Sequence, residues 1–439
     1  MHTRQCAVLV VAVIMLGWMS RAEENPKVAI IKADAPPVID GILNDPCWQK
    51  AAILPDFKII YPAAKRGGTP SNRTAVKLLF DDNFIYIGVE AFDPEPDKVC
   101  TNACVKRDGA WGDDCMEIFI APDGGAKYYQ WIINAAGRIV DIDFSNPKKG
   151  DNTWDSNILA CTGKAKAGWI LEAKIPVAEL GVTSKTTSAW KFNISRWEPR
   201  LMGGQSWGTV YGYDPVKCGN LEGMDLNYAD YVYEVENIDW GSCGLGKDWI
   251  EMKVKNTAGA DKKAAGILTL ECEGALKGTG SNTLALAGGG NGALKIDYEI
   301  GAAGGSGKMN VALADAGNGK TVWLKTKYFD ISAEPVAVKP DKKDYYLSDR
   351  VANVSLEFAM GRETMRTAGA NVTITDESGK EVFNRKTEKM TNNPVVVPVD
   401  ISGFKAGSYR IQAVIFDNGN RKVCSGEGKM SKIKGPFDE

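Results

Sequence analysis

Residues 111–120 read Trp-Gly-Asp-Asp-Cys-Met-Glu-Ile-Phe-Ile. Within this stretch Met116, Ile118 and Ile120 alternate with glutamate and phenylalanine. Successive side chains of a β-strand point to opposite faces, so this period of two predicts a strand with one apolar face. The glycine and acidic residues around Trp111 are typical of a loop. We therefore expect a β-strand that starts beside an exposed indole ring.

The same alternation recurs along the first half of the chain. Residues 75–93 contain two alternating apolar runs on either side of a polar turn at 81–83, which predicts a β-hairpin. Residues 130–134 and 138–144 predict a second hairpin. Many short strands separated by turns are typical of two packed sheets, so the sequence predicts an all-β fold.

The chain of 439 residues is long enough for two or three domains. Tryptophans are dense up to Trp249, and beyond it only Trp323 remains. This change predicts a β-sandwich over residues 23–240 and a smaller Gly/Ala-rich one over 245–332. A third unit, residues 335–432, resembles the immunoglobulin-like sandwiches appended to many exported bacterial proteins, which implies a scaffold role.

The first 22 residues are typical of a cleaved signal peptide. Arg4 provides a basic start, residues 6–18 are apolar, and Ser20 and Ala22 are small residues suited to cleavage. The apolar run is too short for a membrane span, and no second run follows it. We therefore expect no membrane span in the mature chain and a secreted, periplasmic or cell-surface location.

Charge and histidine content exclude several classes of function. The net charge is only -2 and no basic stripe is present, so a nucleic-acid partner is not expected. The only histidine, His2, lies in the predicted signal peptide. The mature chain therefore lacks the usual base of Ser-His or Cys-His catalysis and the commonest ligand of zinc and haem.

Cysteines are numerous for a domain of this size. An exported chain meets an oxidising compartment, so disulfides are expected, although the sequence cannot choose among the possible pairings. Cys100 and Cys104 have a spacing found in zinc sites, but no second pair accompanies them. The six cysteines of the first domain are Cys47, Cys100, Cys104, Cys115, Cys161 and Cys218.

Acidic residues raise two further hypotheses. Asp113, Asp114 and Glu117 could serve as the acid and base of a glycosidase, but no second acid is clearly set in an apolar pocket. Binding of sugar hydroxyls or structural capping is the preferred interpretation. Asp141 and Asp143 alternate with apolar residues and could help to hold a structural Ca²⁺, or they could lie on a solvated strand face.

Three stretches taken together resemble the family 9 carbohydrate-binding modules and their relatives. Residues 37–41 (Pro-Val-Ile-Asp-Gly) are followed by Trp48, then by the hairpin at 75–93, then by residues 111–119. The resemblance covers residues from about 27 to 240. It implies a jelly-roll-like β-sandwich for this region.

Sugar-binding members of that family hold a terminal sugar between two aromatic rings, with an acid, an arginine and asparagines on its hydroxyls. By resemblance, Trp111 corresponds to the first ring, Glu117 to the acid and Asn134 to one asparagine. The second ring has two candidates, Tyr211 and Tyr213.

Two positions depart from the family pattern. Ile132 stands where the arginine is expected, and Trp197 stands where another asparagine would be. Arg196 or Arg138 could replace the missing arginine. The resemblance implies a sugar site built from Trp111, Asp114, Glu117, Asn134, Arg196, Tyr211 and Tyr213.

The sequence thus predicts an exported, non-catalytic protein that binds the end of an oligo- or polysaccharide and assists polysaccharide breakdown. Three alternatives stay open. One is a structural or adhesion protein with a degenerate pocket. Another is a glycoside hydrolase. The third is a haem-binding sandwich with Met116 or Met202 as an axial ligand.

Overall fold

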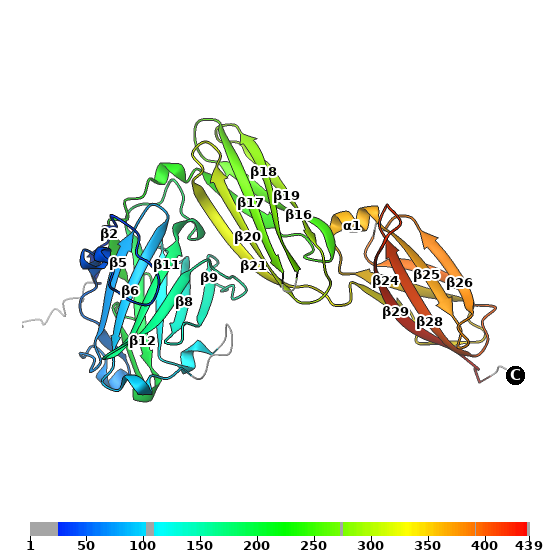
Figure 1. The fold of residues 1–439 in the computed structure, drawn as a ribbon, viewed down its shortest axis with the longest axis horizontal. Helices are drawn as coiled ribbons and strands as arrows, with labels where there is room; N and C mark the ends of the chain where they lie inside the picture. Colours follow the sequence, from blue (N-terminus) through cyan, green and yellow to red (C-terminus); the bar gives the residue numbers. More distant parts are fainter. Residues whose placement is uncertain (1–24, 102–108, 273–274, 391, 437–439) are drawn as a thin grey trace, which may run out of the picture.

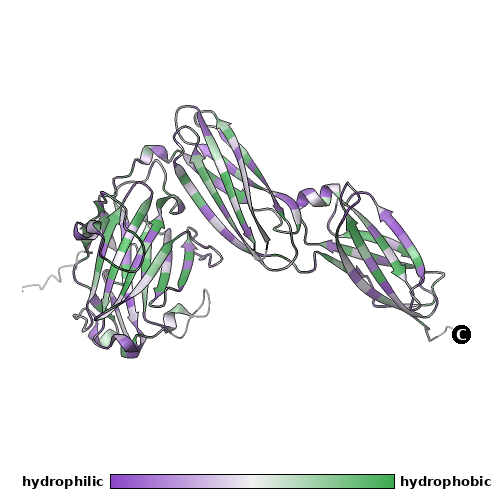
Figure 2. Cartoon of the chain, in the orientation of Figure 1, coloured by the Kyte–Doolittle hydropathy of each residue, from purple (hydrophilic) through white to green (hydrophobic). Residues whose placement is uncertain are grey.

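The structure is a computed structural model that describes residues 25–101, 109–272, 275–390 and 392–436. Three β-sandwiches follow one another along its long axis, from the blue end of the chain to the red (Figure 1). Hydrophobic and hydrophilic residues alternate along many strands (Figure 2). The all-β prediction is confirmed. The predicted signal peptide and Cys104 lie outside the described residues.

The first sandwich packs an eight-stranded sheet on a six-stranded one. The larger sheet contains β1 (Lys27–Ala29), β14 (Gly219–Glu222), β12 (Trp190–Glu198), β7 (Cys115–Ala121), β8 (Tyr128–Asn134) and β9 (Ile139–Phe144), with β13 (Gly203–Ser206) and β4 (Lys58–Tyr61) joined through β12. The smaller sheet contains β10 (Leu159–Ala165), β11 (Gly168–Pro176), β6 (Phe84–Phe92), β5 (Thr74–Phe80) and β2 (Ile31–Lys32), with β3 (Ala52–Ile53) on β5.

Strand β7 lies in the middle of the larger sheet, between β12 and β8. Its residues Met116, Ile118 and Ile120 are fully buried in the main core. Burial of a large apolar side chain contributes about 1.5–3 kcal/mol, so this inward row anchors the sheet. The period of two in the sequence therefore specified both the strand and its buried face.

The Ile-Asp-Gly motif is held in place by one buried carboxylate, that of Glu172 on β11. Its Oε2 accepts the backbone N–H groups of Asp40, Gly41 and Ile42 at 3.0, 2.8 and 3.1 Å. Its Oε1 accepts the indole N–H of Trp48 at 2.9 Å. Gly41 has a φ of +88°, and a Cβ there would lie 3.0 Å from backbone atoms of β10. The motif is thus bound to β11 of the smaller sheet, and these contacts explain the residue types at Gly41 and Trp48.

The second sandwich begins earlier than predicted. The sequence placed residues up to 240 in the first domain, but β15 pairs with β16 of the second sandwich. Its sheets are β15 (Tyr233–Asp239), β16 (Gly246–Asn256) and β19 (Asn291–Ile300), and β18 (Ala275–Leu286), β17 (Lys262–Cys272), β20 (Ser306–Asp315) and β21 (Thr321–Asp330).

The third sandwich has its own core. One sheet contains β22 (Val336–Pro340), β24 (Val351–Phe358) and β27 (Val395–Asp400), and the other contains β23 (Asp344–Tyr346), β29 (Lys422–Ile433), β28 (Gly407–Phe416), β25 (Gly369–Thr375) and β26 (Glu381–Thr387). The helical elements of the described residues are the α-helix α1 (Arg362–Thr367) and the 3₁₀ turns η1 (Pro46–Gln49), η2 (Ala63–Lys65), η3 (Pro96–Lys98), η4 (Ala110–Gly112), η5 (Val177–Glu179), η6 (Pro199–Leu201) and η7 (Tyr228–Asp230).

The expected disulfides do not form between the cysteines that the structure describes. The thiol of Cys100 instead lies 3.4 Å from Oδ1 of Asp113. Free thiols are carried by Cys47, Cys115, Cys161, Cys218, Cys243, Cys272 and Cys424.

Hydrogen bonds from one asparagine join the first two sandwiches. The carboxylate of Glu179 in η5 accepts the backbone N–H of Asn157 at 3.0 and 2.9 Å, and also its side-chain amide. Asn157 donates to Thr326 Oγ1 on β21 at 2.8 Å and accepts from Asn310 on β20 at 2.7 Å. Burial raises the pKa of Glu179 to about 8, although the Asn157 donors act in the opposite direction.

Raising the pH from about 5 to about 8 should destabilise the protein through Glu179. Its pKa rises from an ordinary 4.5 to about 8 on folding. The native state therefore holds a proton that the unfolded state has released, and the free energy of unfolding falls by up to about 1.4 kcal/mol per pH unit. Calorimetric unfolding across this pH window should show that the free energy of unfolding declines less steeply for Glu179→Gln than for the wild type. Identical slopes for the two proteins would contradict the assignment.

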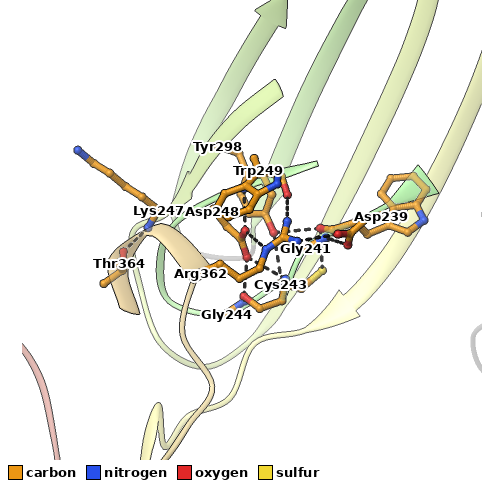
Figure 3. A network of polar contacts seen from close by, with 12 residues as sticks. Asp239, Gly241, Cys243, Gly244, Lys247, Asp248, Trp249, Tyr298, Arg362 and Thr364 are labelled. Carbon is orange, nitrogen blue, oxygen red and sulfur yellow. Dashed lines mark hydrogen bonds and ion pairs between the residues drawn. The ribbon is translucent and has the colours of Figure 1, made fainter. Parts of the chain in front are cut away.

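The second and third sandwiches are joined around Arg362 at the start of α1 (Figure 3). Its guanidinium lies 3.9 Å from the ring centroid of Trp249. It forms ion pairs with the buried Asp248 at 2.7 Å and with Asp239 at 2.6 Å. It also donates to the carbonyl of Trp249. This cation therefore ties α1 to β15 and β16.

Replacing Arg362 by alanine should lower the free energy of unfolding by about 2 kcal/mol, because Asp248 loses its cation while Ser242 still donates to it. Chemical denaturation measures this change. Arg366→Ala is the matched control, since Arg366 also lies over Trp249, at 4.8 Å, and its loss should cost under about 1 kcal/mol. Equal costs for the two variants would show that the ion pairs contribute nothing.

Candidate functional site

A cleft of about 390 Å³ opens on the outer face of the larger sheet of the first sandwich. Strands β4, β7 and β12, the turn η4 and the segment after β13 contribute to it. The cleft combines four aromatic rings with one acid and one arginine. Its lining residues are Ile60, Tyr61, Arg66, Trp111, Glu117, Trp197 and Tyr211.

The alternation along β7 and β12 places two of these residues. Glu117 lies between the inward-facing Met116 and Ile118, so its side chain points to the outer face. On β12, Ser195 is paired with Glu117. Trp197, two residues on, shares its outer face and meets the cleft.

A glycine lets the aromatic walls approach one another. Gly204 on β13 pairs with Tyr61 on β4. A Cβ at position 204 would lie 3.2 Å from the ring of Tyr211 and 3.4 Å from the Cβ of Tyr61. Any larger residue here would push the two tyrosines apart, so we interpret Gly204 as a packing requirement of the cleft.

Trp111 stands at the rim of the cleft. It lies in η4, which begins directly after Gly109 with its φ of +85°, and Trp111 is 45% exposed. Ala110 beside it is fully buried and anchors the turn. The turn therefore fixes the backbone at Trp111, and nearly half of the surface of this residue stays exposed at the cleft.

Glu117 is the acid of the cleft. It is only 3% exposed. One carboxylate oxygen accepts the hydroxyl of Tyr211, and the other accepts the side-chain amide of Gln130 at 3.2 Å. Burial raises the pKa of Glu117, and the bonds from Tyr211 and Gln130 offset that rise in part. Each oxygen keeps a further lone pair for a ligand donor.

The two positions that depart from the family pattern meet in one small apolar cluster. Ile132, where an arginine is expected, is buried with Ala110 and Cys115, and Trp197 packs against this cluster. The place of the arginine is therefore filled by apolar contacts, which give the outer face below the cleft a hydrophobic character.

Arg196 does not reach the cleft, so its predicted role as the replacement arginine is wrong. It alternates with Trp197 and points into the sandwich, where it is 0% exposed. It donates to the carbonyl of Phe92 at 3.0 Å and pairs with Glu198 at 3.2 Å. Burial lowers the pKa of Arg196.

Asp114 and Asn134 shape the loop below Trp111 and do not line the cleft. Asp114 is buried, and its Oδ2 accepts the backbone N–H of Cys100 at 2.8 Å. The side chain of Asn134 donates to Asp113 at 2.8 Å. Its oxygen accepts the backbone N–H of Arg138 at 2.8 Å. Both are structural caps here.

Of the two candidate second rings, the structure places Tyr211 in the cleft and Tyr213 outside it. Tyr213 stacks on Tyr128 with centroids 4.2 Å apart. Its hydroxyl donates to the carbonyl of Gly125. It therefore extends an aromatic stack along β8, away from Glu117.

Asp141 and Asp143 are both buried, so the hypothesis that they lie on a solvated strand face is wrong. Asp141 accepts the backbone N–H of Ser156, and Asp143 forms an ion pair with Lys325 of the second sandwich at 3.1 Å. Within the described ranges, no group of three or more His, Cys, Asp and Glu side chains could hold a metal ion. The structure therefore adds nothing to the calcium hypothesis.

The haem hypothesis also gains no support. Met116 lies fully buried in the sandwich core, where the close packing leaves no room for a macrocycle. Met202 is largely exposed after η6. The two sulfur atoms therefore belong to different environments.

Residues that the sequence did not assign to the cleft are Ile60, Tyr61, Arg66 and Trp197. Alternation along β12 could have placed Trp197, because it must face opposite to Arg196. No comparable pattern exists for Tyr61 or Arg66, which reach the cleft only because β4 pairs with β13.

Residues 39–198 match a family model described as carbohydrate family 9 binding domain-like. The N-terminal sandwich is a family-9-like domain. A search of curated proteins gave no match.

Solved structures with some similarity include a putative carbohydrate-binding protein from Bacteroides uniformis, at 16% identity over 45% of this chain and 99% of that one, with a TM-score of 0.38. Another is a family 9 module from Caldicellulosiruptor kristjanssonii in complex with cellotriose, at 19% identity over 45% of this chain and 92% of that one, with a TM-score of 0.33.

Replacing Tyr211 by phenylalanine should raise the pKa of Glu117 further, because the lost hydroxyl hydrogen bond favours the ionised form. The loss of a bond to a buried carboxylate should also lower the free energy of unfolding by about 1–2 kcal/mol. Carboxyl NMR titration and chemical denaturation measure the two effects. An unchanged Glu117 titration would show that the bond does not form in solution.

Proposed function

We propose that the family-9-like domain binds the end of a carbohydrate chain in the cleft between Trp111 and Tyr211. The observation that carries this proposal is the placement of an exposed indole beside a buried, hydrogen-bonded carboxylate. Aromatic faces pack on the C–H face of a sugar ring, while a carboxylate accepts its hydroxyls. The match of residues 39–198 to the family model supports the same proposal.

Binding without catalysis fits the cleft best. Both glycosidase geometries need two carboxyl groups that flank the scissile bond. Among the described lining residues, Glu117 is the one carboxylate, since Asp113 and Asp114 are committed to Asn134 and Cys100. The domain would therefore hold a glycan and leave its cleavage to another protein.

The two following sandwiches would act as a spacer. Arg362 and Asn157 join neighbouring sandwiches through charged and neutral hydrogen bonds. A protein exported by way of residues 1–22 would present its cleft outside the cytoplasm and assist polysaccharide breakdown there. No helix in the described ranges is long and apolar enough to cross a membrane.

Trp111→Ala should weaken sugar binding by about fivefold or more, since stacking on an aromatic ring contributes on the order of 1 kcal/mol or more. Isothermal calorimetry with a panel of mono- and oligosaccharides measures this. Tyr346→Ala is the control, because Tyr346 is 49% exposed but lies in the third sandwich, and it should bind as the wild type does. Failure of the whole panel to bind would favour a structural role for the chain.

A further inference from the structure

Among the residues that the structure describes, no cation forms an ion pair with the carboxylate of Glu117. Its hydrogen-bond partners in the described chain, Tyr211 and Gln130, are both neutral. The arginine position of the family pattern is occupied by Ile132, and Arg196 points into the sandwich core. Burial of an ionised carboxylate without a cation is unfavourable, and a positively charged ligand would offset that cost.

The aromatic rings around this acid are inclined to one another. Tyr61 and Trp197 have centroids 5.7 Å apart and planes at 56°. Trp197 and Tyr211 have centroids 6.5 Å apart and planes at 79°. With Trp111 at the rim, they form walls around a small space, and such an aromatic cage attracts a cation through the ring quadrupoles.

We propose that the cleft recognises a sugar that carries a protonated amine, an amino sugar at the end of a glycan, with its ammonium group between the aromatic walls and Glu117. This inference rests on the proposed function and narrows its ligand. A cleft of about 390 Å³ accommodates a ligand of this size. The sugar ring would pack against the exposed indole of Trp111.

Arg66 lies at the mouth of the same cleft and carries a positive charge, opposite in sign to that of Glu117. Its side chain is exposed, and its Nε donates to the carbonyl of Ile60 at 3.3 Å. Water screens a charge at such a position, so its effect on a bound ammonium is weak. An acidic sugar would instead be attracted by Arg66 and repelled by Glu117. The two ligand classes therefore predict opposite effects of removing Arg66.

Calorimetric titration of the full chain with glucosamine, glucose and N-acetylglucosamine tests the inference. We expect glucosamine to bind about tenfold more tightly than the two neutral sugars. Glu117→Gln, which keeps the size of the side chain, should abolish this preference. Trp111→Ala should weaken the binding of all three sugars.

A second variant keeps the test decisive if Glu117→Gln does not fold. Arg66→Gln should strengthen glucosamine binding relative to glucose binding about two- to threefold, because it removes a positive charge from the mouth of the cleft. Neutral sugars that bind as tightly as glucosamine would overturn this inference but leave the proposed function standing. Tighter binding of glucuronic acid, lost in Arg66→Gln, would also overturn it. If none of these sugars binds, both this inference and the proposed function are wrong.

Discussion

The alternation of side chains along β7 is the constraint on which both the core and the cleft depend. Its inward row, Met116, Ile118 and Ile120, is fully buried between the sheets. Its outward row carries Glu117 to the cleft. A shift of one residue in register would turn the apolar row to the outer face and place the acid in the core, so hydrophobic burial also fixes where the carboxylate of the cleft lies.

Three buried glutamates show how surroundings assign different roles to one residue type. Glu172 accepts four N–H groups and organises the Ile-Asp-Gly motif. Glu179 accepts from Asn157 at the joint between two sandwiches. Glu117 accepts from Tyr211 and one amide, and it borders a cleft. The carboxylate oxygens of Glu172 and Glu179 accept hydrogen bonds from the protein itself, whereas those of Glu117 can still accept a hydrogen bond from a ligand.

Several elements were predictable because they rest on local patterns. The hairpin at 75–93 forms as β5 and β6, and β7 has the expected apolar face. The predicted roles of Arg196 and Asn134 are not supported by their positions, because a resemblance assigns residue types to places without fixing their partners. Arg196 follows the pleat into the core, and Asn134 is used by its own turn. The predicted domain boundary near residue 240 was wrong because β15 pairs with β16 and so belongs to the second sandwich. Composition along the chain carries no information on strand pairing.

The sequence alone determined that this protein is built from β-sandwiches, that one face of β7 is apolar, and that Trp111 and Glu117 belong to a family-9-like pattern. These features depend on neighbours along the chain, whose spacing in a strand is set by covalent geometry. Only the tertiary structure decided that Tyr61, Trp197 and Tyr211 surround Glu117 while Arg196 does not. That outcome depends on β4, β12 and β13 meeting across long stretches of chain, and on the packing of Ile132 beneath Trp197.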